Sequence, residues 1–167
     1  YCIIPYARGR VRSLPPVLAE QETARLEEQG VHEVVLTGIE IASYGRDLQP
    51  VVSLTDLLCD LLPAHPEMRF RLGSLDPRVV DADFCSRLSG LPNLARHFHL
   101  SLQSGCDSVL QRMGRKYTAE EYYQAVERIR AVIPDASITT DLIVGFPGET
   151  EEEFAETLAF LERCAFA

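Results

Sequence analysis

Glu33-Val34-Val35-Leu36-Thr37 is the first expected β-strand of this sequence. It is short, rich in β-branched residues and apolar through its middle, as expected of a strand that is covered on both faces of a sheet. The run Gly38-Ile39-Glu40-Ile41-Ala42-Ser43-Tyr44-Gly45 follows it and is too polar and glycine-flanked to continue a strand. The sequence therefore predicts a buried strand that ends in a polar loop at Glu40.

The same succession of helix, strand and polar loop recurs along the chain. Expected helices begin at about Val17, Ser53, Asp81, Thr118 and Thr150, a shorter one ends near Met113, and the other expected strands cover 69–73, 97–102 and 138–144. Three of these helices open with the capping-box patterns Ser53-x-x-Asp56, Thr118-x-x-Glu121 and Thr150-x-x-Glu153. Strict alternation of helix and strand predicts right-handed βαβ units and a parallel sheet, either an open sheet or a barrel.

Polar residues follow the ends of the expected strands. They are Glu40, Ser74, Asp76, Gln103 and Ser104. Because the carboxyl ends of parallel strands lie at one edge, where ligands bind in both open sheets and barrels, we expect a site there.

The third expected strand has one polar and one apolar face. His97, His99, Ser101 and Gln103 share the first, and Phe98, Leu100 and Leu102 share the second, while Thr139 and Asp141 make the last strand similarly polar. A polar inner face suits a wide, incomplete barrel with a polar cofactor better than a fully packed one. The alternative is that both histidines are hydrogen-bonded core residues without a ligand.

Length and charge limit the functions open to the chain. With 167 residues, 46% of them hydrophobic, it can build one sizeable core. Sixteen Lys and Arg against twenty-five Asp and Glu give a net charge of -9, which excludes a surface that holds nucleic acid by general neutralisation of phosphates. Two basic groups stand apart, which are Arg8, Arg10 and Arg12, and Arg112, Arg115 and Lys116. A solvated basic face is the plain alternative for each.

The five cysteines indicate a reducing compartment. Cys2, Cys59, Cys85, Cys106 and Cys164 form no Cys-x-x-Cys pair and are odd in number, so a disulfide framework is not expected and the last four are interpreted as structural. No long apolar run or signal-peptide pattern is present, which favours a cytoplasmic protein with no membrane contact.

Tyr1-Cys2-Ile3-Ile4-Pro5-Tyr6-Ala7-Arg8-Gly9 resembles the end of the cluster-binding loop of radical S-adenosylmethionine (SAM) enzymes. In that loop, Cys-x-x-x-Cys-x-x-Cys holds a [4Fe–4S] cluster through thiolates, and Cys2 would be the third ligand. Without the resemblance, a lone cysteine beside an apolar pair would be interpreted as a small buried hydrophobe.

Five further blocks resemble the methylthiotransferase branch of that family. They are 36–45, 71–77, 99–107, 112–118 and 139–150. The blocks around Glu40, Ser74 and Gln103 look most like the tRNA enzyme that acts on N6-threonylcarbamoyladenosine at position 37. The enzymes acting on isopentenyladenosine-37 of tRNA and on an aspartate of ribosomal protein S12 are the alternatives.

The resemblance implies an α/β fold, a partial (β/α)6 radical SAM barrel of the TIM-like kind with parallel strands, truncated at both ends. Residues 1–167 would be the central part of the radical SAM core domain. The first two cluster cysteines, an upstream domain with a second [4Fe–4S] cluster and a downstream RNA-binding domain are expected outside this chain. The tRNA would be bound mainly by those domains, and an electron donor would be a further partner.

The implied chemistry is reductive cleavage of SAM at the cluster, hydrogen abstraction from adenine C2 and transfer of a methylated sulfur. The resemblance and the chemistry of the side chains favour Glu40 for the amino group of SAM and Arg115 for its carboxylate. The remaining expected cofactor contacts are Gln103 and Ser104 at the ribose, Val144 with the Gly145-Phe146 turn at the adenine, and Ser74 and Asp141 in ligand or structural roles.

Two readings from other classes remain open. One is an ordinary α/β barrel enzyme that uses Asp76 and Glu40 as an acid–base pair, and the other is a binding module without catalytic activity. Cysteines placed three and seven residues before Cys2 would distinguish the radical enzyme from both.

Overall fold

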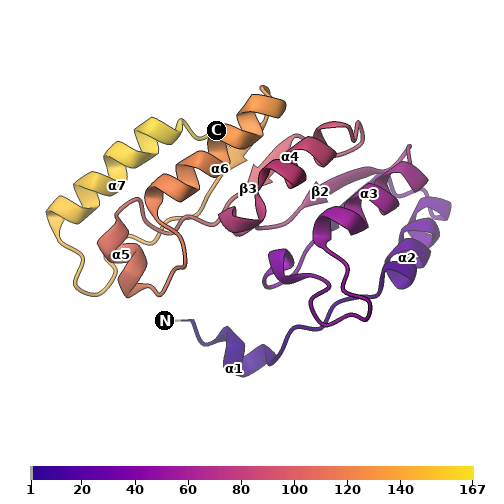
Figure 1. Cartoon of the computed structure of the whole chain (residues 1–167), viewed down its shortest axis with the longest axis horizontal. Helices are drawn as coiled ribbons and strands as arrows, with labels where there is room; N and C mark the ends of the chain where they lie inside the picture. The colour runs from indigo at the N-terminus through magenta and orange to yellow at the C-terminus, as the bar shows by residue number, and fades with distance from the viewer. Residues whose placement is uncertain (1) are drawn as a thin grey trace.

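The strands run parallel and follow chain order in the computed structural model, which describes residues 2–167 (Figure 1). They are β1 (Glu33–Leu36), β2 (Arg69–Leu72), β3 (His97–His99) and β4 (Ser137–Thr139). β1 pairs with β2 and β3 with β4, and isolated parallel bridges from Phe70 to Leu94 and from Leu75 to Leu100 connect the two pairs. The predicted parallel α/β architecture is confirmed.

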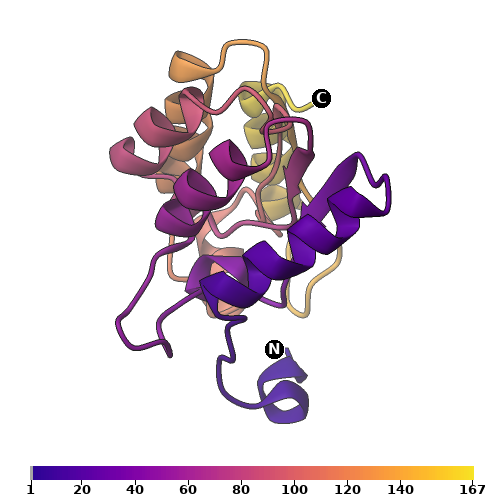
Figure 2. The same ribbon diagram turned by 90° about the vertical axis from the view of Figure 1, so that its right-hand side faces the viewer.

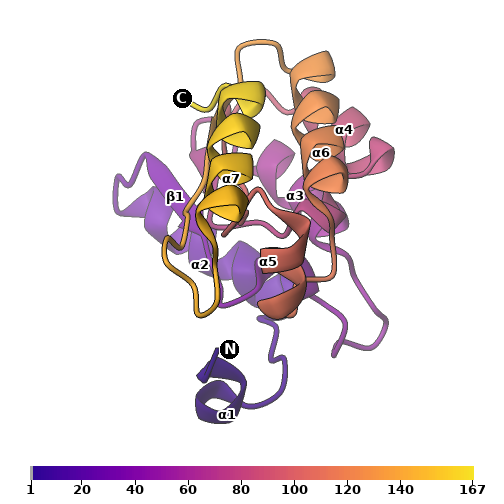
Figure 3. The same ribbon diagram turned by 90° about the vertical axis from the view of Figure 1, so that its left-hand side faces the viewer.

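Helices α2 to α7 cover one face of these strands. The helices are α1 (Ile4–Arg8), α2 (Pro16–Glu28), α3 (Leu54–Ala64), α4 (Ala82–Ser89), α5 (Asp107–Arg112), α6 (Ala119–Val132) and α7 (Glu151–Cys164). Contacts run in series from α2 to α3, α3 to α4, α4 to α6 and α6 to α7, so the longer helices form one continuous layer. Figures 2 and 3 show α1 apart from this layer, beyond the end of the domain at which α7 begins.

The three predicted capping boxes are present. The hydroxyls of Ser53, Thr118 and Thr150 accept the backbone N–H three residues later, at 3.0, 3.1 and 3.3 Å. In each box the acidic side chain also accepts the N–H of the capping residue. These bonds satisfy N–H groups that the first turn of a helix leaves without partners, which explains why the helices begin where the sequence predicts.

The core lies between the strands and the helix layer. Phe98, Leu100 and Leu102 are buried as the alternation along the third strand predicts, whereas His97 and His99 on the opposite face are partly exposed. The buried Tyr122 of α6 packs against this apolar side, and its hydroxyl donates to the Leu100 carbonyl at 3.1 Å. The face away from the helices therefore carries the polar residues.

Two predicted strands are shorter than expected. The third ends at His99 and the fourth at Thr139, rather than at 102 and 144. The Thr140 hydroxyl donates to the Leu100 carbonyl at 2.6 Å and accepts the Leu102 N–H at 3.1 Å, so a side chain replaces part of the strand ladder. Helix α1 was not predicted, because the sequence there indicates a cluster-binding loop. No helix within residues 2–167 is long and apolar enough to cross a membrane.

Candidate functional site

The loops after the four strands lie at one edge of the sheet, which we call the rim. The N–H of Gly73 donates to Leu36 at 2.8 Å, and the N–H of Gln103 donates to Asp141 at 3.0 Å. Together with the bridge from Leu75 to Leu100, these bonds connect each loop to the next along the rim. The predicted gathering of polar loops is thus observed.

Gln103 has an unusual backbone. Its φ of +75° lies in the left-handed region, which is uncommon for a residue with a side chain. Its N–H and carbonyl are both engaged, with Asp141 and with the N–H of Ile143 at 2.9 Å, and these bonds hold the conformation. Residues held in such conformations cluster at functional sites, and Gln103 lies half-buried at the rim. The identity of the residue alone does not reveal this geometry.

Asp76 is paired with Arg78, whose guanidinium donates to both carboxylate oxygens at 2.8 Å. Burial favours the neutral carboxyl, but the hydrogen bonds from Arg78 and the charge of Arg115 hold the pKa of Asp76 below its usual range. The pKa of Arg78 is raised, chiefly by the bond to Asp76 and also by the charge of Glu40. A carboxylate held ionised in this way is a poor general acid, which weakens the interpretation of Asp76 and Glu40 as an acid–base pair.

Ser104 differs from the other predicted cofactor contacts in being buried, and its predicted contact with the ribose remains a prediction. Its side chain is fully buried, with its hydroxyl 3.1 Å from that of Thr157 on α7 and accepting the Cys106 N–H at 3.2 Å. The hydroxyl therefore ties the loop after β3 to α7 and does not reach the rim. The adjacent Gly105 leaves no room for a side chain, since a Cβ there would lie 2.6 Å from the Cβ of Phe160.

The other predicted contact residues face solvent at the rim. Glu40 and Ser74 are exposed, Val144 is 66% exposed, and the Asp141 side chain is exposed with its Oδ2 3.4 Å from His99 Nε2. Arg115 is half-buried, with its guanidinium carbon 6.0 Å from the centre of the Tyr117 ring. These side chains are accessible to a ligand, and their predicted roles remain predictions.

His97 and His99 share one hydrogen-bond partner. The Thr139 hydroxyl lies 3.0 Å from His97 Nε2 and 3.0 Å from His99 Nδ1. Burial, followed by the charge of Arg71 and by His99, lowers the pKa of His97, which favours its neutral form. The bonds to Thr139 agree with the interpretation of both histidines as hydrogen-bonded side chains.

The turn at Gly145-Phe146 is held by a carboxylate that the sequence analysis did not single out. Glu149 accepts the N–H of Gly145 at 2.6 Å and that of Phe146 at 3.0 Å. The sequence signal for this interaction is an acidic residue, Glu149, four positions after the first glycine of a Gly-Phe-Pro-Gly turn. Two hydrogen bonds therefore hold the turn at the point where the adenine is expected.

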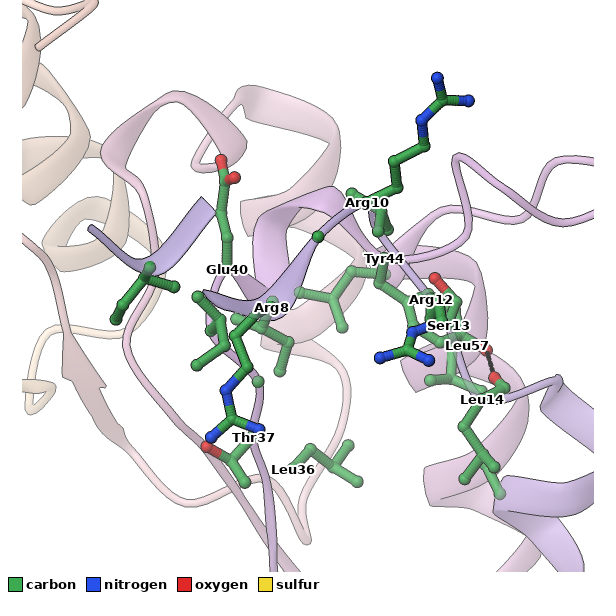
Figure 4. Close-up of a pocket in the computed structure, with 18 residues that line it drawn as sticks. Arg8, Arg10, Arg12, Ser13, Leu14, Leu36, Thr37, Glu40, Tyr44 and Leu57 are labelled. Atoms are coloured by element: carbon green, nitrogen blue, oxygen red, sulfur yellow. Dashed lines mark hydrogen bonds between the residues drawn. The ribbon is translucent and has the colours of Figure 1, made fainter. Parts of the chain in front are cut away.

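A cavity of about 570 Å³ opens beside the rim. One wall is the loop after β1, including Thr37 and Glu40, and the other runs from the end of α1 into the segment behind it, including Arg8 and Arg12. Figure 4 shows these side chains around the cavity, with Arg10 directed outward. Its size is within the range typical of sites for small molecules and cofactors.

Cys2 precedes this segment and is exposed. By contrast, Cys85 and Cys164 are buried, and burial raises the pKa of each thiol, to about 11 for Cys164. Thiols that remain protonated are poor iron ligands. Cys59, of intermediate exposure, lies within α3 away from the rim, and the buried Cys106 Sγ is 3.2 Å from the Ser108 hydroxyl. Cys2 is thus the described cysteine best suited to an external cluster.

The family profile described as the Radical SAM superfamily matches residues 1–161. Curated relatives include "tRNA-2-methylthio-N(6)-dimethylallyladenosine synthase" of Natranaerobius thermophilus, 42% identical over 99% of this chain and 37% of that protein. "Threonylcarbamoyladenosine tRNA methylthiotransferase MtaB" of Thermotoga maritima is 40% identical over 100% of this chain and 38% of that protein. The chain therefore spans less than two-fifths of the length of these relatives.

Solved structures resemble the fold at low sequence identity. The cobalamin-dependent S-adenosylmethionine radical enzyme OxsB with aqua-cobalamin bound has a TM-score of 0.71 and 17% identity, covering 92% of this chain and 23% of that chain. Coproporphyrinogen III oxidase (HemN) from Escherichia coli has a TM-score of 0.62 and 19% identity, covering 87% and 33%. These likenesses concern the fold alone.

Proposed function

This chain belongs to the radical SAM superfamily, and on that premise we propose that it forms the central part of the catalytic barrel of a tRNA methylthiotransferase. The observation that carries the proposal is the cavity of about 570 Å³, where the segment behind Cys2 faces the Glu40 loop. Cys2 itself lies just before the residues that line one wall, and Glu40 lies on the other, so a cofactor held by both would occupy the space next to this pocket. Two curated relatives support methylthiolation of tRNA as the reaction class, because their names describe it on two different modified adenosines.

The residues at this site fit the group that the family implies. The exposed thiol of Cys2 is a soft donor suited to iron, and two cysteines upstream of this chain would complete the ligand set of a [4Fe–4S] cluster. When bound, the cluster and SAM would supply the radical chemistry that replaces hydrogen at adenine C2 by a methylthio group. A second [4Fe–4S] cluster, an electron donor and a cytoplasmic location belong to the same proposal.

The side chains of this chain would bind and orient the cofactor. Glu40 would accept hydrogen bonds from the amino group of SAM, and Arg115 would donate to its carboxylate, because both are accessible groups of the required charge. Gln103 can both donate and accept at the ribose hydroxyls. The backbone at Val144 and the turn held by Glu149 would lie against the adenine. These contacts would exclude water and fix the reacting atom.

We further propose N6-threonylcarbamoyladenosine at position 37 as the substrate, rather than isopentenyladenosine or the S12 aspartate. Support comes from the sequences of the loops at Glu40 and Ser74, which resemble the corresponding loops of the enzyme that modifies that nucleoside. The rim is also polar, since Ser74, Asp76 and Arg78 follow β2 there. A carboxylate-bearing threonylcarbamoyl group suits such a surface better than an apolar isopentenyl group.

The test is an anaerobic assay of the full-length protein with reconstituted clusters, SAM and a chemical reductant. Anticodon stem-loop RNAs carrying threonylcarbamoyl- or isopentenyladenosine, and a peptide from S12, are offered in parallel. Mass spectrometry of digested products should detect the methylthio group on the threonylcarbamoyl RNA. Modification only of the isopentenyl RNA or the peptide would refute the substrate, and 5′-deoxyadenosine formation without any methylthio product would refute the reaction class.

A further inference from the structure

Arg8, Arg10 and Arg12 form a basic segment in an acidic chain. All three are exposed, and they alternate over five residues of a protein with a net charge of -9. We call residues 8–14 the basic arm. The proposed function uses the cavity that this arm lines, but it assigns no contact to Arg8, Arg10 or Arg12.

The arm is held at its C-terminal end. The Ser13 N–H and hydroxyl donate to the Asp47 carboxylate at 2.9 and 2.6 Å, and the Ser13 hydroxyl accepts the Gly45 N–H at 2.8 Å. The Tyr44 hydroxyl donates to the Leu14 carbonyl at 2.7 Å. The hydrogen bonds from Ser13 lower the pKa of Asp47, so this anchor is charged at neutral pH. The arm therefore has a defined position beside the Glu40 loop.

The arginines of the arm have no acidic partners. Within residues 2–167, no carboxylate lies within ion-pair distance of Arg8, Arg10 or Arg12, although Arg25, Arg96 and Arg163 are each paired. Unpaired guanidinium groups at regular spacing are free to bind an external polyanion. Planar guanidinium groups match phosphate oxygens, to which they donate two hydrogen bonds at once.

An exposed aromatic ring stands next to these charges. Tyr6 of α1 is 88% exposed, and Arg8 follows at the end of the same helix. Basic side chains combined with an exposed ring are typical of surfaces that bind single-stranded nucleic acid, because unpaired bases stack on the ring. The arm also lines the cavity that contains Glu40, so a strand bound to it would pass beside the proposed reaction site.

From these observations we infer that the basic arm binds the phosphodiester backbone of the substrate RNA next to the reacting adenosine, an inference that rests on the proposed function. The three arginines contact successive phosphates, and Tyr6 stacks on an unpaired base. The net charge of -9 disfavours general binding of RNA over the rest of the surface, which directs the strand to the arm. Domains outside this chain supply further affinity, while the arm sets the position of the loop.

The test measures RNA binding separately from catalysis. An unmodified anticodon stem-loop RNA with a fluorescent label is titrated with the full-length protein over a range of salt concentrations. The variant carries R8Q, R10Q and R12Q together. We expect affinity to fall at least about tenfold at low salt and the slope of log K against log salt to become shallower by about 2, since each lost phosphate contact removes roughly 0.7 to 0.9.

The control variant carries R25Q, R96Q and R163Q, which changes the net charge equally on exposed side chains outside the arm. It should bind the RNA with the parent slope and affinity, and melting temperatures would verify that both variants fold. Equal slopes for arm variant and parent, or equal losses in arm and control variants, would overturn the inference. A parent that binds RNA through the arm but makes no methylthio product would refute the proposed function alone.

A second variant, Tyr6→Leu, separates stacking from charge. It should weaken RNA binding by about 5-fold to 150-fold, since stacking on one base contributes roughly 1–3 kcal/mol, and leave the salt slope unchanged. If binding of SAM fell in the arm variant while RNA binding stayed at the parent value, the arginines would belong to the cofactor site and the inference would be wrong.

Discussion

The carboxylate of Glu149 accepts the backbone N–H of Gly145 at 2.6 Å, and this bond fixes the turn at the rim. Gly145 has a φ of +71°, so the turn needs both a glycine and an external acceptor for its N–H. The bond joins the end of the polar loop to the residues just before α7.

Replacing Glu149 by Gln tests this brace. An amide oxygen is a weaker acceptor than a carboxylate, and hydrogen bonds to charged groups contribute roughly 1.5–3 kcal/mol. We expect the affinity for SAM to fall by about tenfold while the protein remains folded, as measured by calorimetric titration of the reconstituted full-length protein. Glu151→Gln, an exposed change in the first turn of α7, is the control. Unchanged affinity in Glu149→Gln would exclude the turn from the cofactor site.

Cys2→Ala should abolish formation of 5′-deoxyadenosine in the full-length protein and remove iron from the barrel cluster. Cys59, Cys85, Cys106 and Cys164 can each become Ala with that iron retained. Loss of a small buried side chain costs about 1 kcal/mol, which a domain of ordinary stability tolerates. Iron counting and chromatography of the nucleoside products are the measurements. If the Cys2→Ala variant cleaved SAM at the parent rate, the assignment of Cys2 as a ligand of the cluster would be wrong.

Ser104→Ala should destabilise the protein by about 1–3 kcal/mol without changing its affinity for SAM. The substitution leaves the Cys106 N–H without its acceptor and removes one bond of the Thr157 hydroxyl, which still accepts the Gly105 N–H at 3.2 Å. Urea unfolding measures the loss, and Ser86→Ala on the exposed surface of α4 serves as the control. Because Ser104 and Thr157 share one contact, the double variant with Thr157→Val should lose less stability than the sum of the single changes. An affinity loss without destabilisation would restore Ser104 to the cofactor site.

Glu153 should make the folded state sensitive to acid. Hydrogen bonds from Arg112, Ser108 and the Thr150 N–H lower its pKa from 4.5 to about 2. A lowered pKa stabilises the fold fully above about pH 4.5, and this contribution is lost as the pH falls toward 2. Glu153→Gln should therefore flatten the decrease of unfolding free energy between these pH values, measured by denaturant titration. An exposed neighbour, Glu156→Gln, should leave the profile as in the parent, and identical profiles for all three proteins would refute the prediction.

Local patterns predicted the framework of this domain well. Ser53, Thr118 and Thr150 begin helices as the capping boxes indicate, because a cap depends on residues only three positions apart. The alternation of Phe98, Leu100 and Leu102 with polar neighbours likewise identified the buried face. Both signals are contained in the sequence of a single element.

The site was predicted less completely, because its geometry depends on contacts between distant residues. Ser104 lies next to Gln103 at a strand end, yet its hydroxyl faces α7, more than fifty residues away along the chain. The left-handed backbone of Gln103 is set by pairing with the 141–143 segment. Neither Ser104 nor Gln103 carries this information in its own type or in its neighbours.

Gly45 limits how this part of the protein can vary in length. Its φ is +78°, and a Cβ would meet the Val52 carbonyl oxygen at 1.6 Å, so the chain crosses itself here without room for any side chain. An insertion between Tyr44 and Asp47 would separate the two groups that anchor Ser13. Tolerance to added residues should instead be found at 49–51, which are exposed and lie outside these bonds. In a library of loop insertions across 44–51, the variants that still fold should therefore carry their added residues after Asp47.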